Sequence, residues 1–198
     1  MRTICLYAGS RHGVDPRFTM DANDLGALIA RRGWSLVYGG GGVGLMGVAA
    51  RAALATGGHV VGIIPRALLE REQGFDAVSE LIVTETLRER KALMFERSDA
   101  FVALPGGFGT LEEVVETITL RQLHYHAKPI FFLNSAGFFD PMLAFFAHAV
   151  DAGFIQPEHL RLFTVHDTLP ALLSDLEAVP VTAHRIQPIR SERMESPS

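Results

Sequence analysis

The sequence predicts an α/β fold built on a doubly wound, mostly parallel sheet with helices on both faces. Three observations support this prediction. Short apolar segments alternate with helical patterns along most of the chain. The short segments are apolar at successive positions, as strands are when helices cover both faces of a parallel sheet. Glycine-rich turns follow several of these strands, and ligands of such folds bind beyond the carboxyl ends of the strands.

Seven segments are predicted to be strands, because each is a short apolar run that ends at turn-forming or polar residues. Gly9 follows the first strand, a glycine-rich stretch follows the second, and Pro65 stops the third. The seven segments are residues 3–8, 34–38, 59–64, 81–84, 100–104, 130–133 and 162–165.

The segments between these strands have the periodicity of helices. Apolar residues recur at helical spacing from Phe18 to Ile29, in a helix that begins near Pro16 and ends at Gly33. An alanine-rich helix precedes the third strand, and a polar loop that contains Glu72 precedes the fourth. Further helices are predicted after the fourth, fifth, sixth and seventh strands.

The composition is that of an ordinary globular protein: of 198 residues, 48% are hydrophobic and 20% charged, and the formal net charge is −4. We expect one α/β domain over residues 1–180 and a tail over residues 181–198, where periodicity is lost. The charge does not favour a nucleic-acid partner, no apolar stretch is long enough to cross a membrane, and no secretory leader opens the sequence. The single cysteine, Cys5, excludes a disulfide within the chain, so a cytoplasmic protein is expected.

We expect the functional site around residues 99–117, which read DAFVALPGGFGTLEEVVET. A buried strand runs to Leu104, Pro105 and three glycines end it, and a helix follows. Thr110 is predicted to be the N-cap of this helix, with Glu113 completing a capping box. Any turn between a strand and a helix favours glycine, but bare glycines at a helix start also let an anion approach the backbone N–H groups. The turn is therefore predicted to hold a phosphate.

A second glycine-rich turn spans residues 39–47, and residues 42–47 match the pattern G-x-G-x-x-G. A dinucleotide site would place this turn after the first strand and an acidic residue at the end of the next strand. Here the turn follows the second strand, and the next strand ends in Ile64 and Pro65. Close packing of helix on strand, or approach to a smaller nucleotide, accounts for the glycines better than NAD binding. Candidate ligand contacts on the first and second turns are Gly9, Ser10, Gly41 and Gly42.

Two polar clusters remain. Residues 88–91, RERK, open a helix just past the fourth strand, where an arginine can bind a phosphate or carboxylate through two donors. A solvated helix face is the alternative interpretation of this cluster. His124 and His126 lack a nearby carboxylate or cysteine to complete a metal set, so the C-terminal turn of a helix explains them better and no metal is expected.

The residues Arg90 and Lys91, followed by residues 105–113 (PGGFGTLEE), resemble the paired signature of the Lonely Guy (LOG) family, an R-K and a P-G-G-x-G-T-x-x-E at about this separation. The similarity extends from Cys5 to about Ile155. It implies a Rossmann-like fold, hydrolysis of cytokinin riboside 5′-monophosphates without a cofactor, and a homodimer or larger homo-oligomer whose pocket is completed at a subunit interface.

The resemblance also implies roles for individual residues. Arg90 and Glu113 match the family's catalytic pair, and Lys91 accompanies Arg90 in substrate binding. The other matched substrate-binding residues are Glu72, Gly106, Gly107, Phe108, Gly109, Thr110, Leu111, Glu112 and Thr119.

Three positions depart from the family pattern, and they bear on which base is preferred. Leu87 and Arg88 stand where many members have Met-His, and Leu120 stands where plant members usually have Trp.

The expected chemistry agrees with these residues. Cleaving an N-glycosidic bond builds positive charge on the ribose and negative charge on the departing base, and a carboxylate at Glu113 can stabilise that cation or activate water. We therefore expect a phosphoribohydrolase that converts a purine nucleoside 5′-monophosphate, such as a cytokinin nucleotide or AMP, to free base and ribose 5-phosphate. A non-catalytic nucleotide-binding or carrier protein of the same fold and an NAD-dependent oxidoreductase are the alternatives. Lysine decarboxylation is not expected, because neither Lys91 nor Lys128 has a recognisable pyridoxal context.

Overall fold

The computed structural model describes residues 1–72 and 77–180, apart from the side chains of residues 70–72. In this part of the chain a seven-stranded, all-parallel sheet has the order β4-β3-β2-β1-β5-β6-β7. The strands are β1 (Thr3–Tyr7), β2 (Ser35–Tyr38), β3 (His59–Pro65), β4 (Glu80–Thr84), β5 (Ala100–Ala103), β6 (Ile130–Leu133) and β7 (Thr164–His166). Each predicted strand is present, with its ends within two residues of the expected positions.

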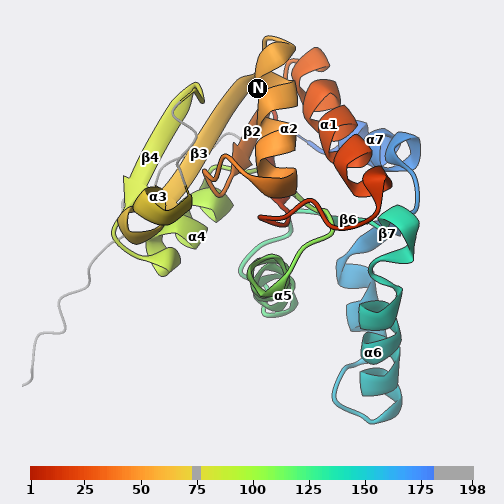
Figure 1. Ribbon diagram of the computed structural model, residues 1–198. Helices are drawn as coiled ribbons and strands as arrows, with labels where there is room; N and C mark the ends of the chain where they lie inside the picture. The colour runs from red at the N-terminus through yellow and green to blue at the C-terminus, as the bar shows by residue number, and fades with distance from the viewer. Residues whose placement is uncertain (73–76, 181–198) are drawn as a thin grey trace, which may run out of the picture.

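Helices cover both faces of the sheet, which confirms the doubly wound α/β prediction (Figure 1). One buried apolar cluster lies between the sheet and α1, α2 and α7, and a second lies between the sheet and α4, α5 and α6. The helices are α1 (Pro16–Arg31), α2 (Gly44–Ala55), α3 (Arg66–Glu72), α4 (Leu87–Glu96), α5 (Phe108–Gln122), α6 (Asp140–Asp151) and α7 (Leu169–Ala178), with short 3-10 helices η1 (Ser135–Gly137) and η2 (Pro157–Leu162). None of the described helices is long and apolar enough to cross a bilayer.

Two local predictions were wrong. The loop expected around Glu72 is instead the end of helix α3. The predicted capping box does not form, because α5 begins at Phe108 with Gly107 as its N-cap, so Thr110 already lies inside the first turn. The Thr110 side chain is buried and packs so closely on Gly106 that a Cβ at Gly106 would clash with it. The predicted tail, residues 181–198, lies outside the described residues.

The strand order reverses at β1, whose neighbours are β2 and β5. The loops that leave β1 and β5 meet at this point, where the Gly9 N–H donates to the Pro105 carbonyl at 3.0 Å. In an open α/β sheet the crevice at such a reversal, beyond the carboxyl ends of the strands, is where ligands bind. The topology therefore brings the turns after β1, β2 and β5 to one edge of the sheet.

Candidate active site

A buried ion pair joins α4 to α5 at this edge. Arg90 Nη2 donates to Glu113 Oε1 at 2.7 Å, and the two side chains are only 11% and 10% exposed. Twenty-three positions separate them in the chain. The structure thus brings together the two residues that the sequence singled out as a pair.

The start of α4 fixes where Arg90 stands. Thr86 is the N-cap, its hydroxyl oxygen accepts from the Glu89 N–H at 3.1 Å, and the Glu89 carboxylate accepts from the Glu85 N–H at 3.0 Å, much as in a capping box. Gly39, at the end of β2, leaves room for the guanidinium, because a Cβ at that position would clash with Arg90 Nη2. The Arg90–Glu113 contact therefore requires a residue without a side chain at position 39.

Burial governs the protonation of Glu113. It raises the pKa of this carboxyl from 4.5 to about 7, although the Arg90 charge opposes the shift. Glu112 and Glu116 add to the increase and Lys91 reduces it. A carboxyl group with a pKa near neutrality can both hold and release a proton at physiological pH, which is what general acid–base catalysis requires.

Lys91 is held by two other carboxylates of α5. Its Nζ pairs with Glu112, and with Glu116 Oε2 at 2.9 Å. Burial acts to lower the pKa of Lys91, but the bonds and charges of these two carboxylates outweigh it and raise the pKa. Lys91 is therefore a protonated cation next to the buried pair.

The N-terminus of α5 is open to a ligand. Among the described residues no side chain caps this helix, and a Cβ at Gly107 or Gly109 would meet no atom within 4 Å. Phe108, between these glycines, is 94% exposed. The first N–H groups of a helix carry partial positive charge and lack partners within the helix, so this end can accept a phosphate.

The N-terminus of α2 is closed by the protein itself. The Gly9 carbonyl accepts from the N–H groups of Leu45 and Met46 at 2.9 and 3.4 Å. A Cβ at Gly44 would clash with the backbone of Ser10, and one at Gly47 with the Gly42 carbonyl. Close packing therefore explains the G-x-G-x-x-G match, two of whose glycines lie inside the helix.

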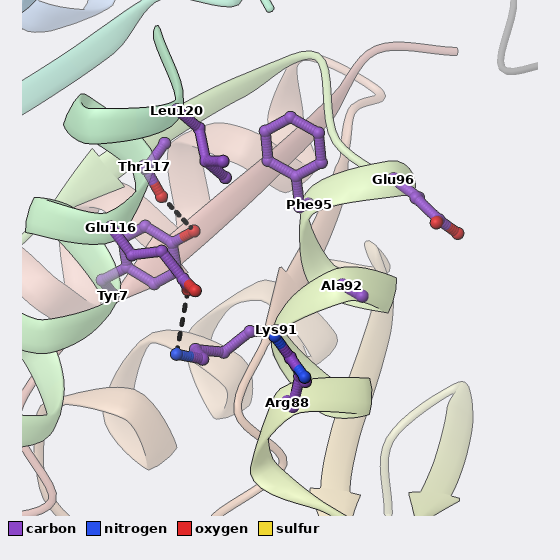
Figure 2. A pocket seen from close by; sticks show the side chains of 9 residues that line it. All are labelled: Tyr7, Arg88, Lys91, Ala92, Phe95, Glu96, Glu116, Thr117 and Leu120. Carbon is purple, nitrogen blue, oxygen red and sulfur yellow. Dashed lines mark hydrogen bonds and ion pairs between the residues drawn. The ribbon is translucent and has the colours of Figure 1, made fainter. Parts of the chain in front are cut away.

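A cavity of about 240 Å³ lies between α4 and α5 (Figure 2). Phe95 and Leu120 face each other across its upper part, and on the α5 side the Tyr7 hydroxyl and Thr117 Oγ1 are 3.0 Å apart. Two of the three positions that depart from the family pattern, Arg88 and Leu120, line this cavity. Its remaining lining residues are Lys91, Ala92, Glu96 and Glu116.

Most of the other predicted site residues lie at the same edge of the sheet. Gly106, Gly107, Phe108, Gly109, Leu111 and Glu112 lie on the turn or the first turns of α5, with Gly9, Ser10, Gly41 and Gly42 on the neighbouring loops at the same edge. Thr119 lies farther along α5, exposed, where its hydroxyl donates to the Val115 carbonyl at 2.8 Å. The Glu72 side chain lies outside the described part of the chain.

His126 makes protein contacts. Its Nε2 lies 2.9 Å from the Thr117 carbonyl, and its Nδ1 accepts from the Lys128 N–H at 3.1 Å. Within the described residues no group of three or more His, Cys, Asp or Glu side chains is arranged to hold a metal ion.

Three residues at this site were not predicted from the sequence: Gly39, Tyr7 and Thr117. Gly39 lies in a conspicuous glycine run, whereas no local pattern marks the other two.

Comparison with known proteins gives matches over most of the chain. A family profile described as "Possible lysine decarboxylase" matches residues 46–176. A protein of Oryza sativa subsp. japonica named "Probable cytokinin riboside 5'-monophosphate phosphoribohydrolase LOGL9" is 48% identical over 181 residues, which is 91% of this chain and 80% of that protein. An Arabidopsis thaliana protein named "Cytokinin riboside 5'-monophosphate phosphoribohydrolase LOG5" is 42% identical over 89% of this chain and 78% of its own length.

Solved structures share the fold. The Moco carrier protein of Chlamydomonas reinhardtii matches with a TM-score of 0.67 and 26% identity, over 89% of this chain and 96% of that protein. The molybdenum cofactor binding protein of the phototrophic bacterium Rippkaea orientalis matches with a TM-score of 0.65 and 25% identity, with the same coverage of each chain.

Proposed function

Since this chain belongs to the Lonely Guy (LOG) family, we propose that it hydrolyses the N-glycosidic bond of a purine nucleoside 5′-monophosphate, releasing the free base and ribose 5-phosphate. Cytokinin nucleotides and AMP are the leading substrates, because the relatives are named for cytokinin riboside 5′-monophosphates. The observation that carries the proposal is the buried ion pair between Arg90 of α4 and Glu113 of α5, since the N-terminus of α5 is open to a phosphate.

The proposed chemistry balances with water as the only co-reactant. The oxygen of water bonds to ribose C1′, the electron pair of the C1′–N bond leaves with the base, and one proton of water passes through Glu113 to the departing base. Glu113 also stabilises positive charge on the ribose as the bond breaks. Arg90 orients the sugar phosphate and opposes protonation of Glu113.

The substrate phosphate supplies binding energy away from the reacting bond. We place it over the first turn of α5, against the N–H groups that follow Gly106, with Lys91 as the nearby cation.

Nothing in this scheme requires a lysine nucleophile, and neither lysine of the chain is well suited to act as a nucleophile. Lys91 is protonated and paired with two carboxylates, and Lys128 Nζ donates to the Phe95 carbonyl at 2.6 Å.

Release of base from mononucleotides tests the proposal. The purified protein is expected to liberate adenine from AMP and isopentenyladenine from the corresponding nucleotide, measured by chromatography, with equal amounts of ribose 5-phosphate. Binding of both nucleotides without release would support a non-catalytic carrier of the same fold, the function named for the Chlamydomonas relative. Tighter binding of NAD than of AMP would instead favour a dinucleotide enzyme.

The phosphate position can be tested at Gly109. Gly109→Ala is expected to weaken AMP binding about tenfold, because the added methyl group stands where the anion approaches, although the protein itself leaves that space empty. The melting temperature should stay the same or rise, since alanine is a better helix former than glycine by about 1 kcal/mol. Gly106→Ala is the contrasting variant: its Cβ clashes with Thr110, so it should lower the melting temperature. Unchanged AMP affinity in Gly109→Ala would contradict the placement of the phosphate.

The proposal includes a homo-oligomer and a cytoplasmic location. Three large apolar or aromatic side chains on and just after α5 are strongly exposed: Val115 (41%), Leu123 (57%) and Tyr125 (74%). These side chains lie on or just after the helix that carries Glu113, and they are suited to cover by a second copy of the chain. Light scattering of the purified protein decides between an oligomer and a monomer.

A further inference from the structure

We infer that residues 126–128, the anchor segment between α5 and β6, hold α4 and α5 at the spacing that the Arg90–Glu113 contact needs. Lys128 and His126 are then positioning residues for the reaction, acting through the two helices without touching the substrate. The effect of the anchor segment on the reaction rests on the proposed hydrolase function. Its effect on the Arg90–Glu113 contact does not depend on that function.

Lys128 ties the C-terminal end of α4 to the sheet. Its Nζ donates to the Phe95 carbonyl at 2.6 Å, in the last turn of α4, and lies 4.3 Å from the centre of the Phe95 ring. The Phe95 ring in turn stacks on Phe101 of β5, with the ring centres 5.6 Å apart. A cation at a helix C-terminus and over an aromatic face is stabilised twice, by the helix dipole and by the ring quadrupole.

His126 ties the same segment to α5. Burial lowers the pKa of the imidazole, and Nδ1 accepts the Lys128 N–H, so the ring is neutral and its Nε2–H donates to the Thr117 carbonyl at 2.9 Å. Thr117 Oγ1 donates to the carbonyl of Glu113 at 2.8 Å, which leaves the Tyr7 hydroxyl to donate to Thr117 Oγ1. The bonds from His126 therefore lead in two steps to the backbone of Glu113.

The cavity explains why such an anchor is needed. Along the middle of the two helices, between Ala92 and Phe95 on one side and Thr117 and Leu120 on the other, a space of about 240 Å³ replaces direct packing (Figure 2). The spacing of α4 and α5 is then set by contacts around this space: by the ion pairs of Arg90 and Lys91 on one side, and by the bonds of the anchor segment to Phe95 and Thr117 on the other.

A movement of Arg90 can be measured through the titration of Glu113, because the pKa of this carboxyl depends on the charges around it. The charges that act most strongly on it are those of Arg90 and Lys91 of α4 and of Glu112 and Glu116 of α5, and Glu113 in turn raises the pKa of Cys5 and of Tyr7 in β1. Lys128 is not among the charges that most strongly shift the pKa of Glu113. A large change in Glu113 titration on replacing Lys128 would therefore report that Arg90 had moved.

The test replaces Lys128 by methionine. We expect base release from AMP to fall roughly 10- to 100-fold in kcat, because displacement of a catalytic group by about 1 Å costs on that order, with a much smaller change in KM. The Glu113 carboxyl, followed by ¹³C NMR and identified by its absence in Glu113→Gln, should titrate at higher pH than in the wild type. Lys128→Arg keeps a cation that can reach the carbonyl and should recover most of both properties.

Arg2→Met is a matched control on the opposite face of the sheet. Arg2 also lies over an aromatic ring, 4.6 Å from the centre of Trp34, and also donates to carbonyls near a helix C-terminus, those of Glu177 and Val179. It should lower the melting temperature without changing kcat or the Glu113 titration. If Lys128→Met does not fold, His126→Leu serves in its place, with the same expected changes.

Equal behaviour of Lys128→Met and Arg2→Met, with neither kcat nor titration altered, would overturn the inference. So would a loss of activity that Lys128→Arg does not recover. If the wild type releases no base at all, the hydrolase proposal fails, and the shift of the Glu113 titration alone then decides whether the anchor segment holds the pair.

Discussion

Replacing Glu113 by glutamine is expected to reduce base release from AMP by roughly 10²- to 10⁴-fold, the usual contribution of a general acid–base group. Glutamine has nearly the same shape, and its amide oxygen can still accept from Arg90 Nη2 across the 2.7 Å contact. It can neither take a proton from water nor stabilise a cation with a full negative charge. AMP affinity, measured by calorimetry, should therefore stay within a few-fold of the wild type while turnover is lost.

Glu177→Gln is a suitable control for this variant. Glu177 lies on α7, on the other face of the sheet, where it pairs with Arg32 at 2.7 Å. It should retain wild-type turnover and AMP binding. If Glu113→Gln retained turnover within tenfold of the wild type, Glu113 would not be the catalytic carboxylate, whatever its burial.

The fold was largely predictable because strands buried on both faces are recognisable as apolar runs, whatever their neighbours. Helix α3 was missed because it is short. Residues 66–72, RALLERE, are mostly good helix formers, but seven residues are too few to show helical periodicity. The start of α5 was placed too late because Thr110 followed by Glu113 fits a capping box. In the structure the Thr110 side chain is packed against Gly106, and the helix begins three residues earlier, with Gly107 as its N-cap.

The site was predictable only in part. The pairing of Arg90 with Glu113 followed from resemblance to a family, since nothing in their spacing says that two helices bring them within 2.7 Å. The two glycine-rich turns look alike in sequence, yet the Gly9 carbonyl fills the end of α2 and leaves the end of α5 open. That difference depends on which loop lies beside which helix, and sequence periodicity carries no such information.

Removing Arg90 is expected to destabilise the protein in a pH-dependent way. Arg90→Met leaves the Glu113 carboxyl buried without its main positive partner, so its pKa rises above the wild-type value of about 7. In the unfolded chain the pKa is the ordinary 4.5, so between these values the folded protein binds more protons than the unfolded one. Stability must then fall as the pH rises through this window.

Urea unfolding of Arg90→Met at pH 6 and pH 8 measures this effect. At pH 8 the wild-type carboxylate is mostly ionised against Arg90, whereas in Arg90→Met its charge would be uncompensated, so the loss of unfolding free energy relative to wild type should exceed the loss at pH 6 by about 1.4 kcal/mol, the linkage over one pH unit. At pH 6 protonation of Glu113 relieves much of that cost. The double variant Arg90→Met/Glu113→Gln has no carboxyl to ionise at this position, so the pH dependence that Glu113 gives to the unfolding free energy should be absent from it. An equal loss for Arg90→Met at pH 6 and pH 8 would mean that packing of the Arg90 side chain, and not its charge, is what Glu113 depends on.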